Sequence, residues 1–300
     1  MKDMIDVTND RNDTKKRYGG PLIIQSISEM RAYSAEARAC GKRIGLVPTM
    51  GALHEGHLSL IRLAASENDT TIVSIFVNPI QFDDPNDLSA YPKTLTEDAE
   101  AAFATGADAV FAPNANEMYP EGFSTFVDMT GITELLCGAS RSSHFRGVLT
   151  VVCKLFCICA PDVAYFGEKD AQQLAVVRKM AEELCMDVTI RSCPTIREED
   201  GLAMSSRNAR LSADERVAAR CLYRALEETG ALYAAGESSA EILTANLRGV
   251  IGREPLARLD YAEVVDPVTF RPTPAAHKDD LMMLAVYIGD VRLIDNRRLI

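Results

Sequence analysis

The chain contains the segment Leu46-Val47-Pro48-Thr49-Met50-Gly51-Ala52-Leu53-His54-Glu55-Gly56-His57-Leu58-Ser59-Leu60, whose pattern predicts a strand, a turn and a helix in succession. The apolar run 44–47 is typical of a buried strand, and Pro48 and Gly51 indicate the turn that ends it. Apolar residues then recur at helical spacing from 56 to 65. The two histidines of the segment lie where this helix begins.

His54 and His57 are three residues apart, which places them on one face of the expected helix. A helix N-terminus has free backbone N–H groups and a partial positive charge, and both attract anions. Two imidazoles at that position indicate a ligand that carries phosphate. Two packed core histidines are the alternative. Zinc binding of the H-E-x-x-H type is disfavoured because it needs a spacing of four.

Composition narrows the class of protein. The chain has 300 residues, a hydrophobic content of 47% and a net charge of −11, which fits one or two globular domains. No basic stretch accompanies the acidic balance, so a nucleic-acid partner is not expected. The eight cysteines are too few for a disulfide scaffold, and we expect buried free thiols, including those at 153, 157 and 159.

Two further expectations concern location. No apolar run reaches the 18 or more residues of a membrane span, so no membrane partner is expected. Residues 1–20 are polar and charged, without the apolar core of a secretion signal, and they predict a flexible tail on a cytoplasmic protein.

A second apolar run, 70–77, is rich in β-branched residues and typical of a strand buried on both faces. Strand, helix and strand over about thirty residues form a right-handed βαβ unit. Further strands are expected at 109–111, 163–166 and 188–190, with helices at 28–39, 96–106, 148–160 and 171–184. The predicted fold class is therefore α/β: a Rossmann-like parallel sheet with helices on both faces, over residues 21–195.

The pattern changes after residue 195. One long helix is expected from 212 to 229 and another from 238 to 251, followed by strands at 259–265, 281–288 and 291–293. These elements predict a smaller α+β C-terminal lid domain over residues 196–300. Two segments of the first domain are less regular: 125–129 is expected to be a strand or edge, and 138–147 either a lid over phosphates or a surface loop.

Three polar clusters follow strands of the expected sheet or its exit: His54 with His57, Lys169 with Asp170, and Ser205-Ser206-Arg207. Hydroxyls and a guanidinium suit phosphate oxygens, although a serine-rich linker is the alternative for the third cluster. The amides Asn78 and Gln81 follow the strand 70–77, where Asn78 is equally explained as a turn former.

Neither a Walker A loop nor a G-x-G-x-x-G motif is present. Phosphates would therefore be held by helix N-termini, imidazoles, lysine and arginine, an arrangement that suits attack at an α-phosphorus with pyrophosphate leaving. Mg²⁺ is expected to accompany the ATP.

The segment 48–57 resembles the HIGH-type signature of the nucleotidylyltransferase superfamily, in the form found in pantoate–β-alanine ligases. The resemblance continues, in the family's order, through 76–82, 91–92, 144–148, 167–170 and 204–208, of which 204–207 resembles the KMSKS loop. It covers the chain from about residue 22 to the C-terminus.

The resemblance implies an ATP-dependent condensation of (R)-pantoate with β-alanine through pantoyl adenylate, releasing AMP and pyrophosphate. It also implies a homodimer. His57 would be the proton donor, and His54, Lys169 and Arg207 complete the implied catalytic set. Gln81 and Gln173 would bind pantoate, and Gln81 later β-alanine. The implied nucleotide contacts are Met50, Gly51, Ala52, Leu53, His54, Glu55, Gly56, His57, Gly167, Glu168, Lys169, Asp170, Ile196, Met204, Ser205, Ser206 and Arg207.

The sequence departs from the family pattern at two places. Ala171 replaces the usual aromatic residue, and Ser142-Ser143 replaces the usual Pro-Gly. Two other functions remain open at this point: a nucleotidylyltransferase that keeps the adenylate as product, and a non-catalytic nucleotide-binding module.

Overall fold

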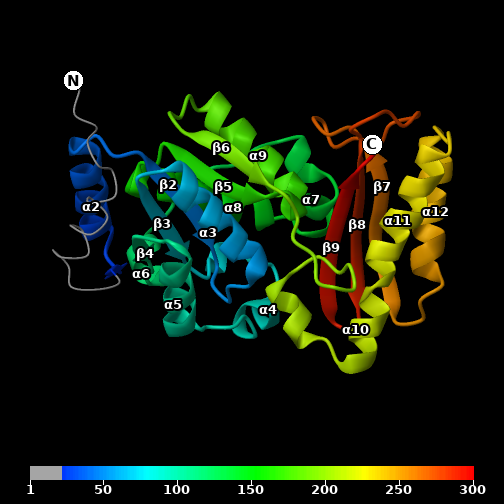
Figure 1. Ribbon diagram of the computed structural model, residues 1–300, viewed down its shortest axis with the longest axis horizontal. Coiled ribbons are helices and arrows are strands. Elements are labelled where there is room, and N and C mark those ends of the chain that lie inside the picture. Colours follow the sequence, from blue (N-terminus) through cyan, green and yellow to red (C-terminus); the bar gives the residue numbers. More distant parts are fainter. Residues whose placement is uncertain (1–21) are drawn as a thin grey trace, which may run out of the picture.

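The computed structural model describes residues 22–300, so the expectation for the tail 1–20 lies outside the described residues. A six-stranded parallel sheet forms the larger part of the molecule, in the spatial order β1-β4-β3-β2-β5-β6 (Figure 1). Its strands are β1 (Leu22–Ile24), β2 (Ile44–Thr49), β3 (Thr70–Ile75), β4 (Ala109–Phe111), β5 (Val163–Gly167) and β6 (Thr189–Cys193). The predicted α/β class is confirmed.

Helices cover both faces of this sheet. Leu46 and Ile72 belong to one buried cluster, and the next residues along the same strands, Val47 and Val73, belong to another. This alternation is expected because successive side chains of a strand point to opposite faces. The first face carries α2 (Ile27–Ala39), α8 (His144–Cys159) and α9 (Ala171–Glu183), and the second carries α3 (Glu55–Glu67) and α5 (Leu95–Thr105).

The strand order changes direction between β2 and β5. Gly45 pairs with Val163, and Leu46 pairs with Ala164, so the two strands are neighbours although β3 and β4 lie between them in the chain. Ligands of open α/β sheets bind beyond the carboxyl ends of the strands at such a switch point. The turns after β2 and β5 are thereby brought to one place.

The C-terminal unit is a three-stranded antiparallel sheet of β7 (Ala257–Val265), β8 (Leu281–Ile288) and β9 (Val291–Arg298). Helices α11 (Cys221–Ala234) and α12 (Ala240–Gly252) cover one of its faces (Figure 1). On the other face, Val265 and Met283 pack with Ala175 of α9. This second apolar contact joins the small sheet to the large unit.

Two expected elements are wrong. Residues 125–129 form no strand; the Val127 N–H donates instead to Thr150 Oγ1 of α8 at 3.0 Å. The single helix expected from 212 to 229 is divided into α10 (Ala213–Ala219) and α11, because the Arg220 N–H bonds the carbonyl of Val217, three residues back, and tightens the turn there.

The polar stretch 138–147 is neither a lid nor a surface loop. It consists of α7 (Cys137–Ser140), a short turn and the first residues of α8, which begins at His144. The eight cysteines are free, as expected, but Cys40, Cys157 and Cys185 are exposed rather than buried. The remaining short helices are α4 (Pro85–Ser89) and α6 (Ala115–Met118).

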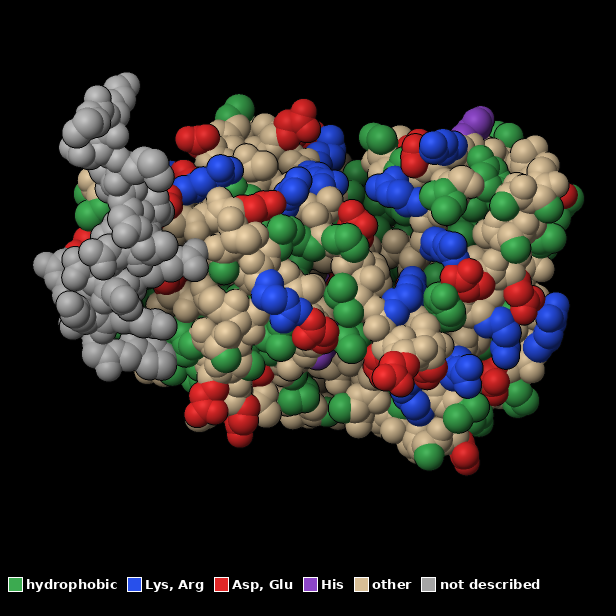
Figure 2. Space-filling view, in the orientation of Figure 1, with side chains coloured by type: hydrophobic (Ala, Val, Ile, Leu, Met, Phe, Trp, Pro, Cys, Tyr) green, Lys and Arg blue, Asp and Glu red, His purple; other side chains and the backbone are tan. Residues whose placement is uncertain are grey.

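Charged side chains of both signs are interspersed over the face of the molecule drawn in Figure 2, without a continuous basic surface. Within residues 22–300, no helix has both the length and the apolar character needed to cross a bilayer.

Candidate active site

The turn between β2 and α3 is held by a carboxylate from a different helix. Gly51 and Ala52 have left-handed backbone angles, with φ of +83° and +50°, a conformation that is uncommon for alanine. Asp98 of α5 is 4% exposed and accepts hydrogen bonds from the N–H groups of Ala52 at 2.8 Å and Leu53 at 2.7 Å. These charge-assisted bonds stabilise the strained turn that presents the two histidines.

The two imidazoles are oriented by the start of α3. His54 is the N-cap residue, and its Nδ1 accepts the Gly56 N–H at 3.2 Å. His57 Nδ1 accepts the N–H of His54 at 3.3 Å, and the two ring centroids are 4.1 Å apart. Since each Nδ1 is an acceptor, the proton of each neutral ring is on Nε2.

Both rings are neutral at pH 7. Burial, with His54 and Lys169 nearby, lowers the pKa of His57 to about 3. Burial and Lys169 lower the pKa of His54 to about 4. The rings therefore offer two Nε2–H donors rather than two positive charges.

A cavity of about 210 Å³, here called the inner cavity, brings together side chains from distant parts of the sequence. His54 and His57 line it with Lys169, from the turn η4 (Glu168–Asp170) after β5, and Arg207, from the turn η5 (Ser206–Arg210). The other predicted residues that line it are Met50, Gly56, Gln81, Gly167, Asp170, Gln173, Ile196, Met204, Ser205 and Ser206. The four side chains predicted to be catalytic thus face one space.

Five predicted nucleotide contacts do not line this cavity: Gly51, Ala52, Leu53, Glu55 and Glu168. The N–H groups of Ala52 and Leu53 point to Asp98 instead. The Glu55 carboxylate forms an ion pair with Arg62. The Glu168 carbonyl accepts a hydrogen bond from β9, as described below.

A second cavity, of about 330 Å³, shares five lining residues with the first: Lys169, Asp170, Gln173, Ser205 and Arg207. It extends between α7 and the small sheet, where Tyr261 and Arg292 line it. The two cavities adjoin, and the cleft therefore lies between the large unit and the C-terminal sheet.

Gln81 is held by several hydrogen bonds. It closes the turn η2 (Pro79–Gln81) and is 7% exposed. Its side-chain oxygen accepts from Asn78 Nδ2 at 2.9 Å, and its amide nitrogen approaches the sulfur of Met50 at 3.0 Å. The same Asn78 nitrogen donates to the Gly147 carbonyl of α8 at 3.0 Å. The orientation of the Gln81 amide is therefore fixed by both η2 and α8.

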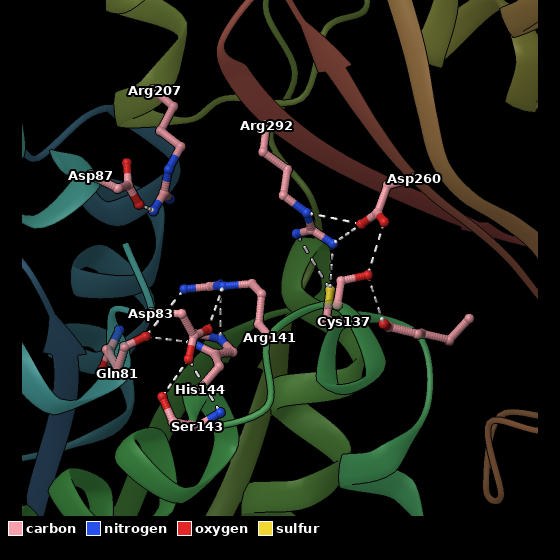
Figure 3. Close-up of polar contacts among 12 residues, drawn as sticks. Gln81, Asp83, Asp87, Cys137, Arg141, Ser143, His144, Arg207, Asp260 and Arg292 are labelled. Carbon is pink, nitrogen blue, oxygen red and sulfur yellow. Dashed lines mark hydrogen bonds and ion pairs between the residues drawn. The ribbon is translucent and has the colours of Figure 1, made fainter. Parts of the chain in front are cut away.

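The main chain of Gln81 is held from the other side (Figure 3). Arg141 Nη2 donates to its carbonyl at 3.2 Å, and His144 Nδ1 donates to the same oxygen at 3.0 Å. Burial and the adjacent Arg141 lower the pKa of His144 to about 3, so this ring is neutral too. Arg141 and His144 thus support Gln81, and with Ser140 they also line the cavity of about 330 Å³.

Arg207 forms an ion pair with an aspartate that is not among the predicted site residues. Its Nη2 lies 2.8 Å from Asp87 of α4 (Figure 3), and Arg210 contacts the same carboxylate at 2.7 Å. Burial raises the pKa of Asp87, but the two arginines outweigh it, and the net pKa lies below the ordinary value. Tyr91 lies 3.2 Å from the Ser206 hydroxyl and also lines the inner cavity. The loop 204–207 is thereby joined to the large unit.

Sequence reasoning gives no role to Asp87, Tyr91, Asp98 or Asn296. Two sequence features could have indicated a role for Tyr91: it belongs to a segment that resembles the family, and it follows an acidic loop. The sequence places Asp98 on the solvated face of its helix, since carboxylates are common in a first helical turn. Its burial is not visible in the local pattern.

The chain matches the family model described as pantoate-beta-alanine ligase over residues 22–298. It is 53% identical to pantothenate synthetase of Heliobacterium modesticaldum over 91% of this chain and 98% of that protein. It is 51% identical to pantothenate synthetase of Geobacter sulfurreducens over 91% of this chain and 97% of that protein.

Solved structures give the same result. The crystal structure of pantothenate synthetase from Thermus thermophilus superposes with a TM-score of 0.88 at 40% identity, covering 93% of this chain and 99% of that one. Pantoate-beta-alanine ligase from Francisella tularensis, complexed with beta-gamma ATP and beta-alanine, superposes with a TM-score of 0.77 at 35% identity, covering 93% and 98%.

Proposed function

The chain belongs to the pantoate–β-alanine ligase family, and we propose that its cleft carries out that family's reaction, the ATP-dependent condensation of pantoate with β-alanine. The observation that supports this most strongly is the single cavity lined by His54, His57, Lys169 and Arg207. ATP is the substrate whose phosphates these donors and cations fit.

In the first half-reaction, a pantoate carboxylate oxygen attacks the α-phosphorus, and the bond to the bridging oxygen of pyrophosphate breaks. Negative charge grows on the phosphoryl oxygens during this step. We propose that the Nε2–H groups of His54 and His57 and the ammonium of Lys169, which line one cavity, stabilise this charge. Because the pKa of His57 is about 3, we propose this ring as a neutral hydrogen-bond donor rather than as the proton donor that the resemblance implies.

In the second half-reaction, the amine of β-alanine attacks the acyl carbon, loses a proton and displaces AMP. Gln81 and Gln173 both line the inner cavity and are proposed to hold pantoate. The fixed amide of Gln81 is proposed to hold β-alanine after pyrophosphate has left. An amide can donate and accept at once, which suits a hydroxy acid and then an amino acid.

Magnesium is proposed to enter with the nucleotide. Asp170 is a carboxylate that lines both cavities, and oxygen ligands of this kind, shared with phosphate oxygens, are what Mg²⁺ prefers. The ion would neutralise charge on the triphosphate. We also propose a cytoplasmic homodimer, as the family resemblance implies, which light scattering of the purified protein tests for the oligomeric state.

A coupled assay of AMP release tests the reaction. We expect AMP only when ATP, pantoate, β-alanine and Mg²⁺ are all present. Pyrophosphate formed with pantoate alone, and no dependence of AMP release on β-alanine, would instead indicate an adenylate-releasing nucleotidylyltransferase. ATP binding without either product would indicate a non-catalytic module.

The variant His57→Ala tests the site within that assay. We expect adenylate formation to fall by about 100-fold, as for the loss of one aligned donor to a developing oxyanion. His277→Ala is the matched control, because the His277 side chain is 73% exposed and lines neither cavity. Equal rates in the two variants would remove His57 from the mechanism.

A further inference from the structure

Strand β9 of the C-terminal unit reaches the turn that carries Lys169. Asn296 is 8% exposed, and its Nδ2 donates to the carbonyl of Glu168 at 2.9 Å and to the carbonyl of Lys169 at 2.8 Å. Both hydrogens of one amide are thus used on two successive peptide groups of η4. The main chain of the lysine is held by a residue 127 positions further along the sequence.

The preceding residue of β9 holds the other cation-bearing segment. Asp295 is 2% exposed and accepts from Arg197 Nη1 at 2.7 Å and Nη2 at 3.0 Å. The Arg197 side chain also donates to the Gly201 carbonyl at 3.0 Å. The Arg197 backbone forms an antiparallel β-bridge with Ala203, at the base of the loop that ends at Arg207. A bidentate, partly buried ion pair of this kind fixes both position and orientation.

We propose that Asn296 is a positioning residue for Lys169. Through Asn296 and Asp295, strand β9 fixes the position of Lys169 relative to the 204–207 loop. The inference deepens the proposed function and rests on it, since Lys169 is assigned there to the phosphates. Two successive residues of β9 hold different segments: Asp295 binds Arg197 at the base of the loop, and Asn296 binds the turn that carries Lys169. The C-terminal unit therefore forms one wall of the cleft and also fixes the relative positions of Lys169 and the 204–207 loop.

The chemistry of the contact selects an amide. Two carbonyl oxygens need two N–H donors, and the asparagine side chain offers them from one nitrogen. Aspartate has nearly the same shape but would place oxygen against oxygen in a buried site. Such a change removes the donors that Asn296 supplies to the Glu168 and Lys169 carbonyls, and we expect it to displace the turn.

The variant Asn296→Asp tests the proposal by two measurements: pantoate-dependent exchange of pyrophosphate into ATP, and calorimetric affinity for ATP. We expect exchange to fall by about 10- to 100-fold, in line with the loss of paired buried hydrogen bonds, and ATP affinity to weaken. Asn246→Asp is the matched control. Its amide donates to Thr229 at 2.8 Å in the same C-terminal unit, away from both cavities, and we expect exchange within about twofold of wild type, as for distant independent sites.

A double-mutant cycle with Lys169→Ala separates positioning from general destabilisation. If Asn296 acts through Lys169, the change Asn296→Asp lowers exchange little further once the lysine side chain is gone. The proposal would be overturned if Asn296→Asp lowered the exchange rate by the same factor in the wild-type and the Lys169→Ala proteins. So would an Asn296→Asp protein that matches wild type in exchange and affinity.

A second substitution covers the case in which the introduced carboxylate prevents folding. Asn296→Ala removes the donors without adding charge, and it is expected to show the same coupling to Lys169→Ala in a protein that unfolds cooperatively. If both variants fail to fold, Asn296 serves stability and the proposal is wrong. If wild type itself shows no pantoate-dependent exchange, the proposed function fails, whereas the ATP affinities of the four proteins of the cycle still decide whether Asn296 acts through Lys169.

Discussion

At Gly147, α8 lies against the turn that carries Gln81. A methyl group added there would lie 2.5 Å from the Ile80 carbonyl oxygen, 2.6 Å from the Gln81 Cα and 2.7 Å from the Gln81 nitrogen. All three atoms belong to the backbone, so no side chain can rotate away. The substitution Gly147→Ala must push α8 and η2 apart.

The magnitude follows from two opposed terms. Overpacking a close contact costs about 1–3 kcal/mol, and a rigid backbone on the other side places this contact near the upper end. Alanine in place of glycine within a helix returns up to about 1 kcal/mol. We expect a net loss of about 2 kcal/mol in the free energy of unfolding. Because the Asn78–Gly147 hydrogen bond is displaced as well, the KM for pantoate should rise by about tenfold, which corresponds to about 1.4 kcal/mol.

Gly249→Ala is the matched control, since a methyl group at this helical glycine of α12 meets no atom within 4 Å. It should stabilise the protein by about 0.5–1 kcal/mol and leave the KM for pantoate unchanged. Urea unfolding and steady-state kinetics of both variants provide the measurements. A Gly147→Ala protein as stable as the control, with a normal KM for pantoate, would refute the close approach of α8 to Gln81.

Three other outcomes are expected. The pKa values of His57 and His144 are about 3 in the folded chain, below the unfolded value, so only the unfolded state takes up these protons as pH falls below 6.5. The free energy of unfolding should fall by about 2 kcal/mol per ring between pH 6.5 and pH 5, and a flat urea-unfolding profile over that window would contradict it. Asp98→Ala should weaken ATP binding and lower stability by about 2–4 kcal/mol through the loss of two charge-assisted bonds, and unchanged calorimetric affinity for ATP would count against its role in the turn. Gln81→Ala should raise the KM for pantoate more than the KM for ATP, and the reverse order would disprove the assignment of the amide to pantoate.

The sequence predicts the core of the fold because its signals are local. The apolar run 44–47 and the helical spacing from 56 onward correctly predict β2 and α3, but the predicted strand end at Pro48 is wrong, because β2 continues to Thr49. Buried parallel strands are recognised from their β-branched runs in the same way. The polar turns at 167–170 and 204–207 are predicted to face the histidine turn, and the strand order accounts for their meeting.

The errors and omissions arise where distant contacts override local pattern. His144 follows a polar stretch typical of a loop, yet it begins a helix and its ring is held inward, because that ring donates a hydrogen bond to the Gln81 carbonyl. The extended residues 125–129 have strand-like composition, but their backbone pairs with a side chain of α8 instead of another strand. Asn296 lies in an ordinary strand pattern, and its two acceptors are visible only once β9 is placed against η4.

The pairing of β2 with β5 has a consequence for synthesis of the chain. The Ile44 N–H donates to the Asp162 carboxylate, a partner 118 positions later, and the strand that follows Asp162 completes this edge of β2. Since chains emerge N-terminal end first, a nascent chain holds an apolar strand with an open edge while more than a hundred further residues are translated. Contacts of such long sequence separation also form slowly. Slower translation or a lower growth temperature should therefore change the yield of folded protein more than the final stability of the enzyme.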